Sequence, residues 1–216
     1  MTGLVARKHD FQDPEYARDW SNQFVPSPSR LILFDAIIDR LCEQLLPRSH
    51  IVELGIGPGF LAERLLSRLP DVTYEGVDFS GPMLQLAAER LSPYVARLIL
   101  TRADLTSSDW TARLTHPIGA FVSTWTLHDL GGQIQTAKVY RDCHRHLATD
   151  GILLNGDFVK PSGARLEFEE GRFTVDRHLD LLKAAGFHDP RCILFLEHEI
   201  NNPSTSQNCV CLEALV

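Results

Sequence analysis

Acidic side chains follow three predicted strands at the point where each strand ends. Glu53 lies near the end of one apolar run, Asp78 closes the run 72–78, and Asp104 follows the run 96–100. Because the carboxyl ends of parallel strands meet at one edge of a sheet, we expect these three carboxylates to face the same ligand. Each could instead cap a turn or a helix, and for Asp104 taken alone both interpretations stay open.

A glycine turn joins the first of these strands to a helix. Gly55, Gly57 and Gly59 stand within the stretch His50–Phe60, and glycine lets a backbone turn sharply and approach a ligand without a clash from Cβ. From Phe60 onward apolar residues recur at helical spacing, so a helix begins directly after the glycines. Its free N–H groups point toward whatever binds there, which is a nucleotide-binding geometry.

The spacing between the glycines and the second acid also fits a nucleotide. Asp78 stands nineteen residues after Gly59, where a carboxylate at the tip of the adjacent strand can accept both hydroxyls of a ribose. The stretch Gly57–Ala62 satisfies the pattern Gly-x-Gly-x-x-Ala of nicotinamide dehydrogenases. A dehydrogenase that uses NAD is therefore an alternative when these residues are read by themselves.

Strands and helices alternate along most of the chain, which predicts an α/β fold with a parallel sheet covered by helices on both faces. The predicted strands are 51–54, 72–78, 96–100, 118–123 and 152–159, with a turn at 149–151 before the last of them. The predicted helices are 29–46 with Ser29 as N-cap, 60–69, 80–91 with Ser80 as N-cap, 131–147, and 173–185 closed by Gly186. Two further strands, 192–197 and 208–215, have a short link and are expected to pair as an antiparallel hairpin.

Composition and charge exclude several classes of protein. The 216 residues, 44% hydrophobic and 23% charged, are ordinary for one soluble domain. A net charge of −7 disfavours binding to nucleic acid, which needs clustered Lys and Arg. No apolar run is long enough to cross a bilayer and no apolar leader follows the N-terminus, so a cytoplasmic protein with no membrane partner is expected. The five cysteines include no Cys-x-x-Cys pair, so neither a disulfide framework nor a metal site is predicted.

Residues 1–28 form a polar and aromatic arm before the first core helix. Tyr16 and Trp20 lie four residues apart, on one face of a predicted short helix that also carries Arg18. The aromatic residues either pack this arm onto the body or contact a substrate beneath it as a lid. We therefore divide the chain into an N-terminal arm or lid, 1–28, and one domain, 29–216.

Five motifs follow one another along the chain: Val-Glu-Leu-Gly-Ile-Gly-Pro-Gly at 52–59, Gly-Val-Asp-Phe-Ser-Gly-Pro-Met-Leu at 76–84, Arg-Ala-Asp-Leu at 102–105, Trp-Thr-Leu-His-Asp-Leu at 125–130, and Leu-Leu-Lys-Ala-Ala-Gly-Phe at 181–187. In this order they resemble the motifs of the class I S-adenosylmethionine-dependent methyltransferases. The likeness spans about residues 30–216, and the arm lies outside it. It implies a doubly wound, Rossmann-like sheet of seven strands in the order 3-2-1-4-5-7-6, with the last strand antiparallel.

The resemblance also implies which residues bind S-adenosyl-L-methionine. The glycines Gly55, Gly57 and Gly59 would admit the methionine part, with Glu53 supporting that loop or the ammonium group. Asp78 would hold the ribose hydroxyls. Phe79 and Met83 would flank the adenine, Asp104 would accept a hydrogen bond from its amino group, and Leu105 would pack on the ring. Ser123, Thr124 and Trp125 would line the wall beside the sulfonium, where backbone carbonyls suit a cation.

Methyl transfer is an in-line displacement that depends mainly on holding the nucleophile along the reacting axis in a dry pocket. A base matters for hydroxyl acceptors, and His128 is the candidate, with Asp129 or another carboxylate to orient it. His128 could instead only structure the turn in which it stands. The chain lacks the Asn-Pro-Pro-Tyr pattern of relatives that methylate exocyclic or glutamine nitrogens, so a small metabolite is expected to accept the methyl group on O, N or C.

Tyr16, Arg18, Trp20 and Trp125 are the predicted contacts to that acceptor. Two other functions stay open besides the methyltransferase. One is the NAD-dependent oxidoreductase described above, against which Glu53, Asp104 and the C-terminal hairpin argue. The other is a non-catalytic subunit that binds S-adenosylmethionine, since one fold can host different functions. The sequence carries no signal of the oligomeric state.

Overall fold

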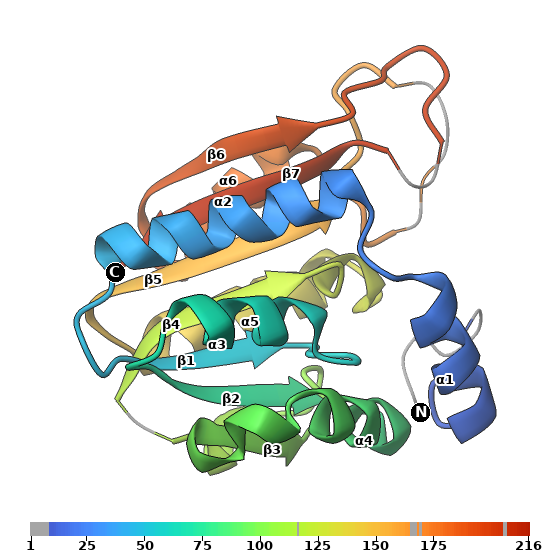
Figure 1. The fold of residues 1–216 in the computed structure, drawn as a ribbon. Coiled ribbons are helices and arrows are strands. Elements are labelled where there is room, and N and C mark those ends of the chain that lie inside the picture. The colour runs from blue at the N-terminus through green and yellow to red at the C-terminus, as the bar shows by residue number, and fades with distance from the viewer. Residues whose placement is uncertain (1–8, 116, 165–167, 169, 205–206) are drawn as a thin grey trace.

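A seven-stranded sheet forms the centre of the computed structural model, which describes residues 9–115, 117–164, 168, 170–204 and 207–216 (Figure 1). Its strands follow the order β3-β2-β1-β4-β5-β7-β6, and β7 is antiparallel to both of its neighbours. The strands are β1 (His50–Leu54), β2 (Thr73–Asp78), β3 (Leu98–Arg102), β4 (Ile118–Thr124), β5 (Leu147–Phe158), β6 (His188–Leu196) and β7 (Cys209–Leu215). The predicted order and the antiparallel hairpin are confirmed.

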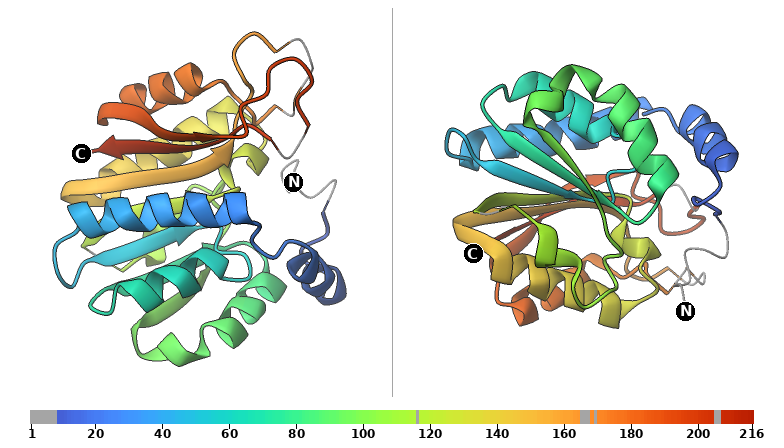
Figure 2. Two further views of the ribbon diagram at one scale, coloured as in Figure 1. Left: turned by 45° about the horizontal axis from the view of Figure 1, so that its top comes forward. Right: turned by 90° about the horizontal axis from the view of Figure 1, so that it is seen from below.

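Helices cover both faces of the sheet, as Figure 2 shows: α2, α3 and α4 lie on one face and α5 and α6 on the other. The helices are α1 (Pro14–Gln23), α2 (Pro28–Gln44), α3 (Phe60–Arg68), α4 (Gly81–Arg90), α5 (Gln133–His146) and α6 (Val175–Ala185). Short 3₁₀ helices occur at η2 (Ser92–Arg97), η3 (Trp110–Arg113) and η4 (Leu127–Asp129). This arrangement is the doubly wound α/β fold that the alternating pattern predicts.

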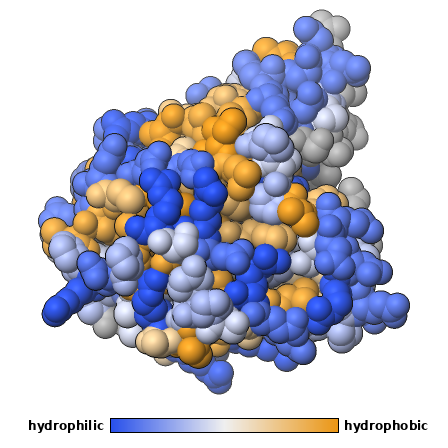
Figure 3. Space-filling model, viewed as in Figure 1, coloured by the Kyte–Doolittle hydropathy of each residue, from blue (hydrophilic) through white to orange (hydrophobic). Residues whose placement is uncertain are grey.

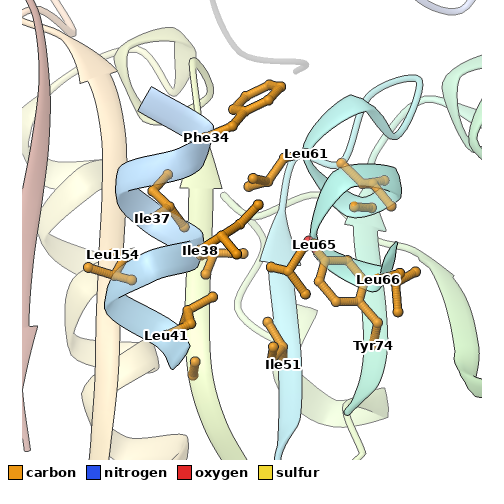
Figure 4. Close-up of a cluster of buried hydrophobic side chains, with 14 of the residues drawn as sticks. Phe34, Ile37, Ile38, Leu41, Ile51, Leu61, Leu65, Leu66, Tyr74 and Leu154 are labelled. Carbon is orange, nitrogen blue, oxygen red and sulfur yellow. The ribbon is translucent and has the colours of Figure 1, made fainter. Parts of the chain in front are cut away.

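The two helical layers bury two separate apolar clusters against the sheet. Side chains of β1 alternate between them: Ile51 points toward α2 and α3, while Val52 and Leu54 point toward the layer of α5 and α6. All five residues of β1 are buried, so this strand is covered on both faces. Figure 4 shows the first cluster, in which side chains of α2 and α3 meet above Ile51 and Tyr74. The central strand is therefore fixed firmly, and its carboxyl end is a rigid base for the glycine turn.

The helix caps confirm one predicted helix start and place two other starts at different residues. Ser80 caps α4 as predicted, because its hydroxyl accepts a hydrogen bond from the Met83 N–H at 3.1 Å. The N-cap of α2 is Ser27 and not Ser29, and Pro28 takes the first helical position, where its missing N–H costs nothing. Thr174 caps α6, so this helix starts two residues later than predicted.

Two predicted boundaries on the strands are wrong. The third strand is Leu98–Arg102 and not 96–100, because Ser92–Arg97 continue as a 3₁₀ helix after α4. The predicted turn at 149–151 lies inside β5, where the pairing with β4 shifts register between Ile118 and Ala120. Asp150 has a φ of 64° at this bulge, so a turn residue is accommodated without ending the strand.

The N-terminal arm lies beyond the carboxyl ends of the parallel strands and packs on α4 (Figure 1). The Ser80 hydroxyl donates to the Phe11 carbonyl, and the Gln12 amide donates to the Phe79 carbonyl at 3.3 Å. The arm therefore reaches the segment that follows Asp78. The division at residue 28 into an arm and a domain stays a prediction.

None of the helices in the described part of the chain is long and apolar enough to cross a membrane. Hydrophilic side chains cover most of the face in Figure 3, and apolar side chains are exposed in patches between them. Ile32, 52% exposed, and Leu46, 77% exposed, are examples on α2 and just after it.

The glycine turn rests on the second strand through one close contact. Ile56 is buried directly over Gly76, and a Cβ added to Gly76 would overlap the Cδ1 atom of Ile56. Backbone hydrogen bonds support the same contact, since the N–H groups of Gly55 and Ile56 both donate to the Val77 carbonyl, at 2.8 and 3.0 Å. Glycine at position 76 is thus required by the packing of the turn.

We expect Gly76→Ala to lower the free energy of unfolding by about 1–3 kcal/mol, because the added methyl overpacks a buried contact. Ile56→Val removes the overlapping Cδ1, so the double variant should recover part of the loss relative to the sum of the single variants. Urea denaturation of the four proteins measures this coupling. Strict additivity of the two changes would show that the contact does not hold the turn.

Candidate functional site

The three glycines of the turn have three different surroundings. All have positive φ, at 69° for Gly55, 52° for Gly57 and 83° for Gly59, which disfavours other residues. A Cβ on Gly55 would overlap the Thr126 side chain, so this glycine packs the turn against the segment after β4. A Cβ on Gly57 would meet no atom within 4 Å. Gly57 therefore presents bare backbone to open space, beside the start of α3.

Glu53 is a fully buried carboxyl group beneath this turn. It is 1% exposed and accepts a hydrogen bond from the Tyr74 hydroxyl at 2.7 Å. Burial raises the pKa of Glu53 to about 8; the Tyr74 hydrogen bond opposes this rise, and the nearby Asp78 carboxylate adds to it. At neutral pH the group is therefore mainly protonated, and a cation placed next to it would favour its ionised form.

Asp78 joins the turn to the end of β2. Its Oδ2 accepts from the Gly57 N–H at 2.9 Å, and its Oδ1 accepts from the Ser80 N–H at 2.9 Å. Burial raises the pKa of Asp78 to about 6, although these backbone hydrogen bonds act in the opposite direction. Since each carboxylate oxygen can accept two hydrogen bonds, both oxygens keep capacity for hydroxyl donors.

The residues predicted to surround an adenine lie near Asp78. Met83 is buried in the first turn of α4, and Leu105 is buried in the cluster beneath α5 and α6. Phe79 is 37% exposed beside the carboxyl end of β2. Asp104 is exposed, and its Oδ1 accepts from the Thr106 N–H and hydroxyl, at 2.8 and 2.7 Å. Asp104 thus stabilises a local turn through one of its oxygens. Capping a turn is one of the two interpretations of Asp104 that the sequence left open.

The end of β4 forms the wall opposite Asp78. The buried Ser123 hydroxyl donates to the Leu54 carbonyl at 3.2 Å, which ties β4 to β1, and Thr124 is the last residue of the strand. Trp125 then turns with a φ of 48°, and its N–H donates to the Gly156 carbonyl at 2.8 Å. A non-glycine residue in this conformation is uncommon. The indole ring lies between Phe34 and Phe158, with ring centroids 5.7 and 6.2 Å away.

His128 is held by a carboxylate that the sequence did not single out. Its Nδ1 lies 2.6 Å from Asp157 Oδ1, and its backbone N–H donates to Asp157 Oδ2 at 2.9 Å. Asp129, the predicted orienting residue, lies 3.5 Å from the other ring nitrogen, Nε2. Asp157 thus contacts the Nδ1 side of the ring and Asp129 stands on the Nε2 side, and the catalytic role of His128 and Asp129 stays a prediction.

The charge of Asp157 controls the proton on His128. Burial alone would lower the pKa of His128, but the attraction and hydrogen bond of Asp157 outweigh burial, and the pKa is raised above its ordinary value. Burial likewise raises the pKa of Asp157, but His128 opposes it more strongly, so the pKa of Asp157 is lowered. Together these shifts favour an imidazolium–carboxylate pair in the resting protein.

Tyr140, Asn155 and His178 form a second group of buried polar side chains near this pair. The Tyr140 hydroxyl lies 2.9 Å from His178 Nδ1 and accepts from the Asn155 amide at 3.3 Å. Burial lowers the pKa of His178 to about 4, so this ring is neutral at physiological pH. The two histidines therefore differ in charge, because only His128 is paired with a carboxylate.

A pocket of about 270 Å³ opens beside Trp125, between the end of the arm and the sheet. Its lining includes Phe24 and Val25 before α2, Arg30 in the first turn of α2, Phe158 at the end of β5, Glu197 after β6 and Cys209 at the start of β7. Phe158 also stands edge-on to the His128 ring, with centroids 5.4 Å apart. Phe158 thus lines the pocket and also contacts the His128 ring.

The arm residues predicted as substrate contacts lie outside this pocket lining. Tyr16 contacts Phe11 and the His9 ring, and Trp20 stacks on Phe24 with centroids 4.6 Å apart. Arg18 pairs with Glu89 on the outer surface of α4 at 3.3 Å, and both side chains are about half exposed. These contacts support the interpretation that the aromatic residues pack the arm onto the body. Phe24 and Val25 are the arm residues that face the pocket.

Sequence and structure comparisons agree with this geometry. A sequence profile described as "Methyltransferase domain" matches residues 51–151. An uncharacterized methyltransferase of Bacillus subtilis (strain 168), YdaC, is 47% identical over 49 residues, which cover 23% of this chain and 27% of that protein. The chain therefore aligns with well under half of the length of this curated relative.

Two solved structures share the fold over almost the whole chain. The CurJ carbon methyltransferase superposes with a TM-score of 0.72 at 18% identity, covering 98% of this chain and 60% of that one. Human N-acetylserotonin methyltransferase in complex with S-adenosylmethionine superposes with a TM-score of 0.68 at 13% identity, covering 97% and 59%. At these identities the likeness concerns the fold.

The matched methyltransferase-domain profile, the strand order and the turn at the end of β1 agree with the resemblance to the class I S-adenosylmethionine-dependent methyltransferases.

The buried proton of Glu53 predicts a pH-dependent stability. Its pKa is raised from 4.5 to about 8 by folding, so its contribution to stability is full below pH 4.5 and is lost as the pH rises toward 8. Glu53→Gln keeps an acceptor for Tyr74 but cannot ionise. We expect the variant to gain stability relative to wild type across this interval, by up to about 1.4 kcal/mol per pH unit.

Thermal or urea unfolding at several pH values between 5 and 8 measures this difference. Asp78, whose pKa is about 6, adds a similar slope below that pH in both proteins, so it cancels in the comparison. Parallel stability curves for wild type and Glu53→Gln would contradict a buried, protonated Glu53.

Proposed function

We propose that this protein transfers the methyl group of S-adenosylmethionine to an O, N or C nucleophile of a small metabolite. The observation that carries the proposal is the open space at Gly57, which lies between a buried carboxyl group at Glu53 and a second one at Asp78. The matched profile and the fold support the same assignment.

The residues around this space fit the chemistry of S-adenosylmethionine. Gly57 offers bare backbone that any larger residue would cover, and Asp78 keeps lone pairs for two hydroxyl donors. Glu53 would take its charged form beside an ammonium group, so we expect it to release a proton when the ligand binds. Phe79 and Met83 would contact the adenine, and Asp104 has a second oxygen, Oδ2, for an amino group.

Bound S-adenosylmethionine supplies an electrophilic methyl group on a cationic sulfur. The protein's part is to hold the acceptor in line and to exclude water, which can supply most of the rate enhancement. Ser123, Thr124 and Trp125 follow the rigid centre of the sheet, so they can form a fixed wall for this purpose. Phe24 and Val25 cover the pocket from the side of the arm.

For a hydroxyl acceptor we assign proton removal to His128, with Asp157 as the residue that orients it. Hydrogen bonding to Nδ1 leaves Nε2 to accept the proton, and Asp129, 3.5 Å from Nε2, marks the side on which the acceptor would lie. The base must lose its own proton first, so the raised pKa of His128 sets a lower limit for the active pH range.

A small acceptor fits the charge and the size of the pocket. A volume of about 270 Å³ lies just below the usual range for ligand sites, which starts near 300 Å³. The net charge of −7 opposes a nucleic acid substrate. A macromolecular partner and a membrane are not part of the proposal.

Calorimetry with S-adenosylmethionine, S-adenosylhomocysteine and NAD separates this proposal from its two alternatives. Tight binding of NAD without either sulfur ligand would favour an oxidoreductase. Binding of the sulfur ligands with no product from any acceptor in a broad panel would favour a non-catalytic binding subunit.

Gly57→Ala tests directly whether the backbone at Gly57 contacts the ligand. The added methyl would occupy the space offered to the ligand, so we expect the dissociation constant of S-adenosylhomocysteine to rise at least about tenfold, which corresponds to about 1.4 kcal/mol. Gly163→Ala is the matched control, since Gly163 also has a positive φ, 83°, with no atom within 4 Å of an added Cβ. Both variants should lose a similar, small amount of stability. Equal ligand affinity in the two variants would remove Gly57 from the site.

Asp157→Asn tests the proton assignment. Without the Asp157 charge, burial dominates, so we expect the pKa of His128 to fall from above 6.5 to below it. NMR titration of the histidine ring protons measures this, with His128→Asn to identify the resonance. For a hydroxyl acceptor, the rise of kcat with pH should move to lower pH in Asp157→Asn, and His128→Asn should lose about 10²–10⁴-fold in kcat.

An unchanged titration in Asp157→Asn would contradict the pairing. If His128→Asn kept full activity toward a hydroxyl acceptor, His128 would have only a structural role in its turn.

A further inference from the structure

Among the described residues that line the pocket beside Trp125, Arg30 is the one cation, and its surroundings suggest what binds there. Arg30 stands in the first turn of α2, and the lining around it combines the aromatic side chains Phe24, Trp125 and Phe158 with polar ones, among them Ser29 and Glu197. The guanidinium carbon lies 4.9 Å from the centroid of the Trp125 ring and 5.4 Å from that of Phe24. Arg30 is thus held between the arm and the wall that follows β4.

No carboxylate among the described residues pairs with this guanidinium. Its hydrogen bond runs from Nη1 to the Phe24 carbonyl, at 3.0 Å, and uses one of five N–H donors. Glu197, which lines the same pocket, accepts instead from the Ser29 hydroxyl at 2.6 Å. By contrast, Arg64 and Arg191 each pair with a carboxylate at 2.7 Å.

The surroundings leave the charge of Arg30 poorly compensated. The side chain is half-buried, and loss of solvation lowers its pKa below the ordinary value, though arginine stays charged throughout the physiological range. Arg30 also stands at the N-terminal end of α2, where the helix dipole adds positive potential. An anion with two oxygens in a plane would match the guanidinium donors and restore the lost interactions.

We propose that Arg30 binds a carboxylate of the methyl acceptor, and that the acceptor is a monocarboxylic acid built on a single apolar ring. This inference rests on the proposed function, because it names the acceptor of the same site. The pocket volume of about 270 Å³ exceeds a cavity of about 150 Å³ that holds benzene, so one substituted ring fits. The Trp125 and Phe158 rings provide apolar walls for it.

Glu197 sets a limit on the charge of the acceptor. Its carboxylate lines the same pocket as Arg30, so a second carboxylate on the ligand would be repelled. The arrangement therefore selects monoacids over diacids of similar size.

The test measures binding of benzoate, benzamide and phthalate to the full-length protein by calorimetry, with and without saturating S-adenosylhomocysteine. Benzamide keeps the shape of benzoate without its charge, and phthalate adds a second carboxylate. We expect wild type to bind benzoate at least about tenfold more tightly than either of the other two. Arg30→Gln should abolish the preference for benzoate over benzamide, and Arg30→Lys, which keeps the charge but not the planar donor pair, should retain part of it.

Glu197→Gln is the matched control in the same pocket. It should keep the affinity for benzoate and raise that for phthalate. Wild type that binds benzoate and benzamide equally would overturn the proposal, and so would Arg30→Gln that keeps the wild-type preference. The wild-type comparison needs no variant, so it stands even if Arg30→Gln disturbs the contact with Phe24.

Failure of this inference is distinguishable from failure of the proposed function. If S-adenosylhomocysteine binds and benzoate shows no preference, the methyltransferase assignment stands and Arg30 does not recognise the acceptor. If S-adenosylhomocysteine does not bind to wild type, the proposed function fails whatever the benzoate result.

Discussion

The hydrogen bond from the Gly57 N–H to Asp78 is the contact on which the rest of the site depends. It joins the turn after β1 to the end of β2, and it can form because glycine adopts a φ of 52° at that point. It also places the open face of Gly57 beside two buried carboxyl groups whose pKa values are raised. Ionisation of both groups in the absence of a cation is costly, so the protein holds a site that a cationic ligand with hydroxyl groups would stabilise.

His128 and Asp157 repeat the same physical scheme with the opposite outcome. Asp157 is the penultimate residue of β5 and is buried, as Asp78 is at the end of β2, yet its pKa is lowered because His128 stands in hydrogen-bond contact with it. Burial therefore does not determine the charge of these groups by itself. A buried acid with a cationic partner ionises more easily, and a buried acid with only neutral donors holds its proton to a higher pH. The site thus combines, at one edge of one sheet, acids whose pKa values are shifted in opposite directions.

Most of the fold and the position of the glycine turn could be predicted from sequence because their determinants are local. The glycine turn, Glu53 and Asp78 are set by short segments in which strand, turn and helix follow directly. The partners of these residues could not be predicted in the same way. Tyr74 meets Glu53 across neighbouring strands whose register no local pattern gives, and Asp157 of β5 meets His128 in the 3₁₀ helix η4 that follows β4. The sequence did contain one signal for Asp157. It is an acid near the carboxyl end of a predicted strand, and this is the criterion that selected Asp78.

The pocket was missed for a related reason. Its walls come from residues near 24–30, 125, 158 and 196–209, which the fold brings together only after the sheet is complete. The candidate acceptor residues Tyr16, Arg18 and Trp20 have the right chemistry for a contact, but they have other partners: Tyr16 contacts Phe11, Trp20 stacks on Phe24, and Arg18 pairs with Glu89 of α4. Phe24 and Val25 lie after that helix and before α2, and they line the pocket instead. What distinguishes a packing residue from a pocket residue is thus its position relative to the end of α1, and this depends on tertiary packing more than on residue type.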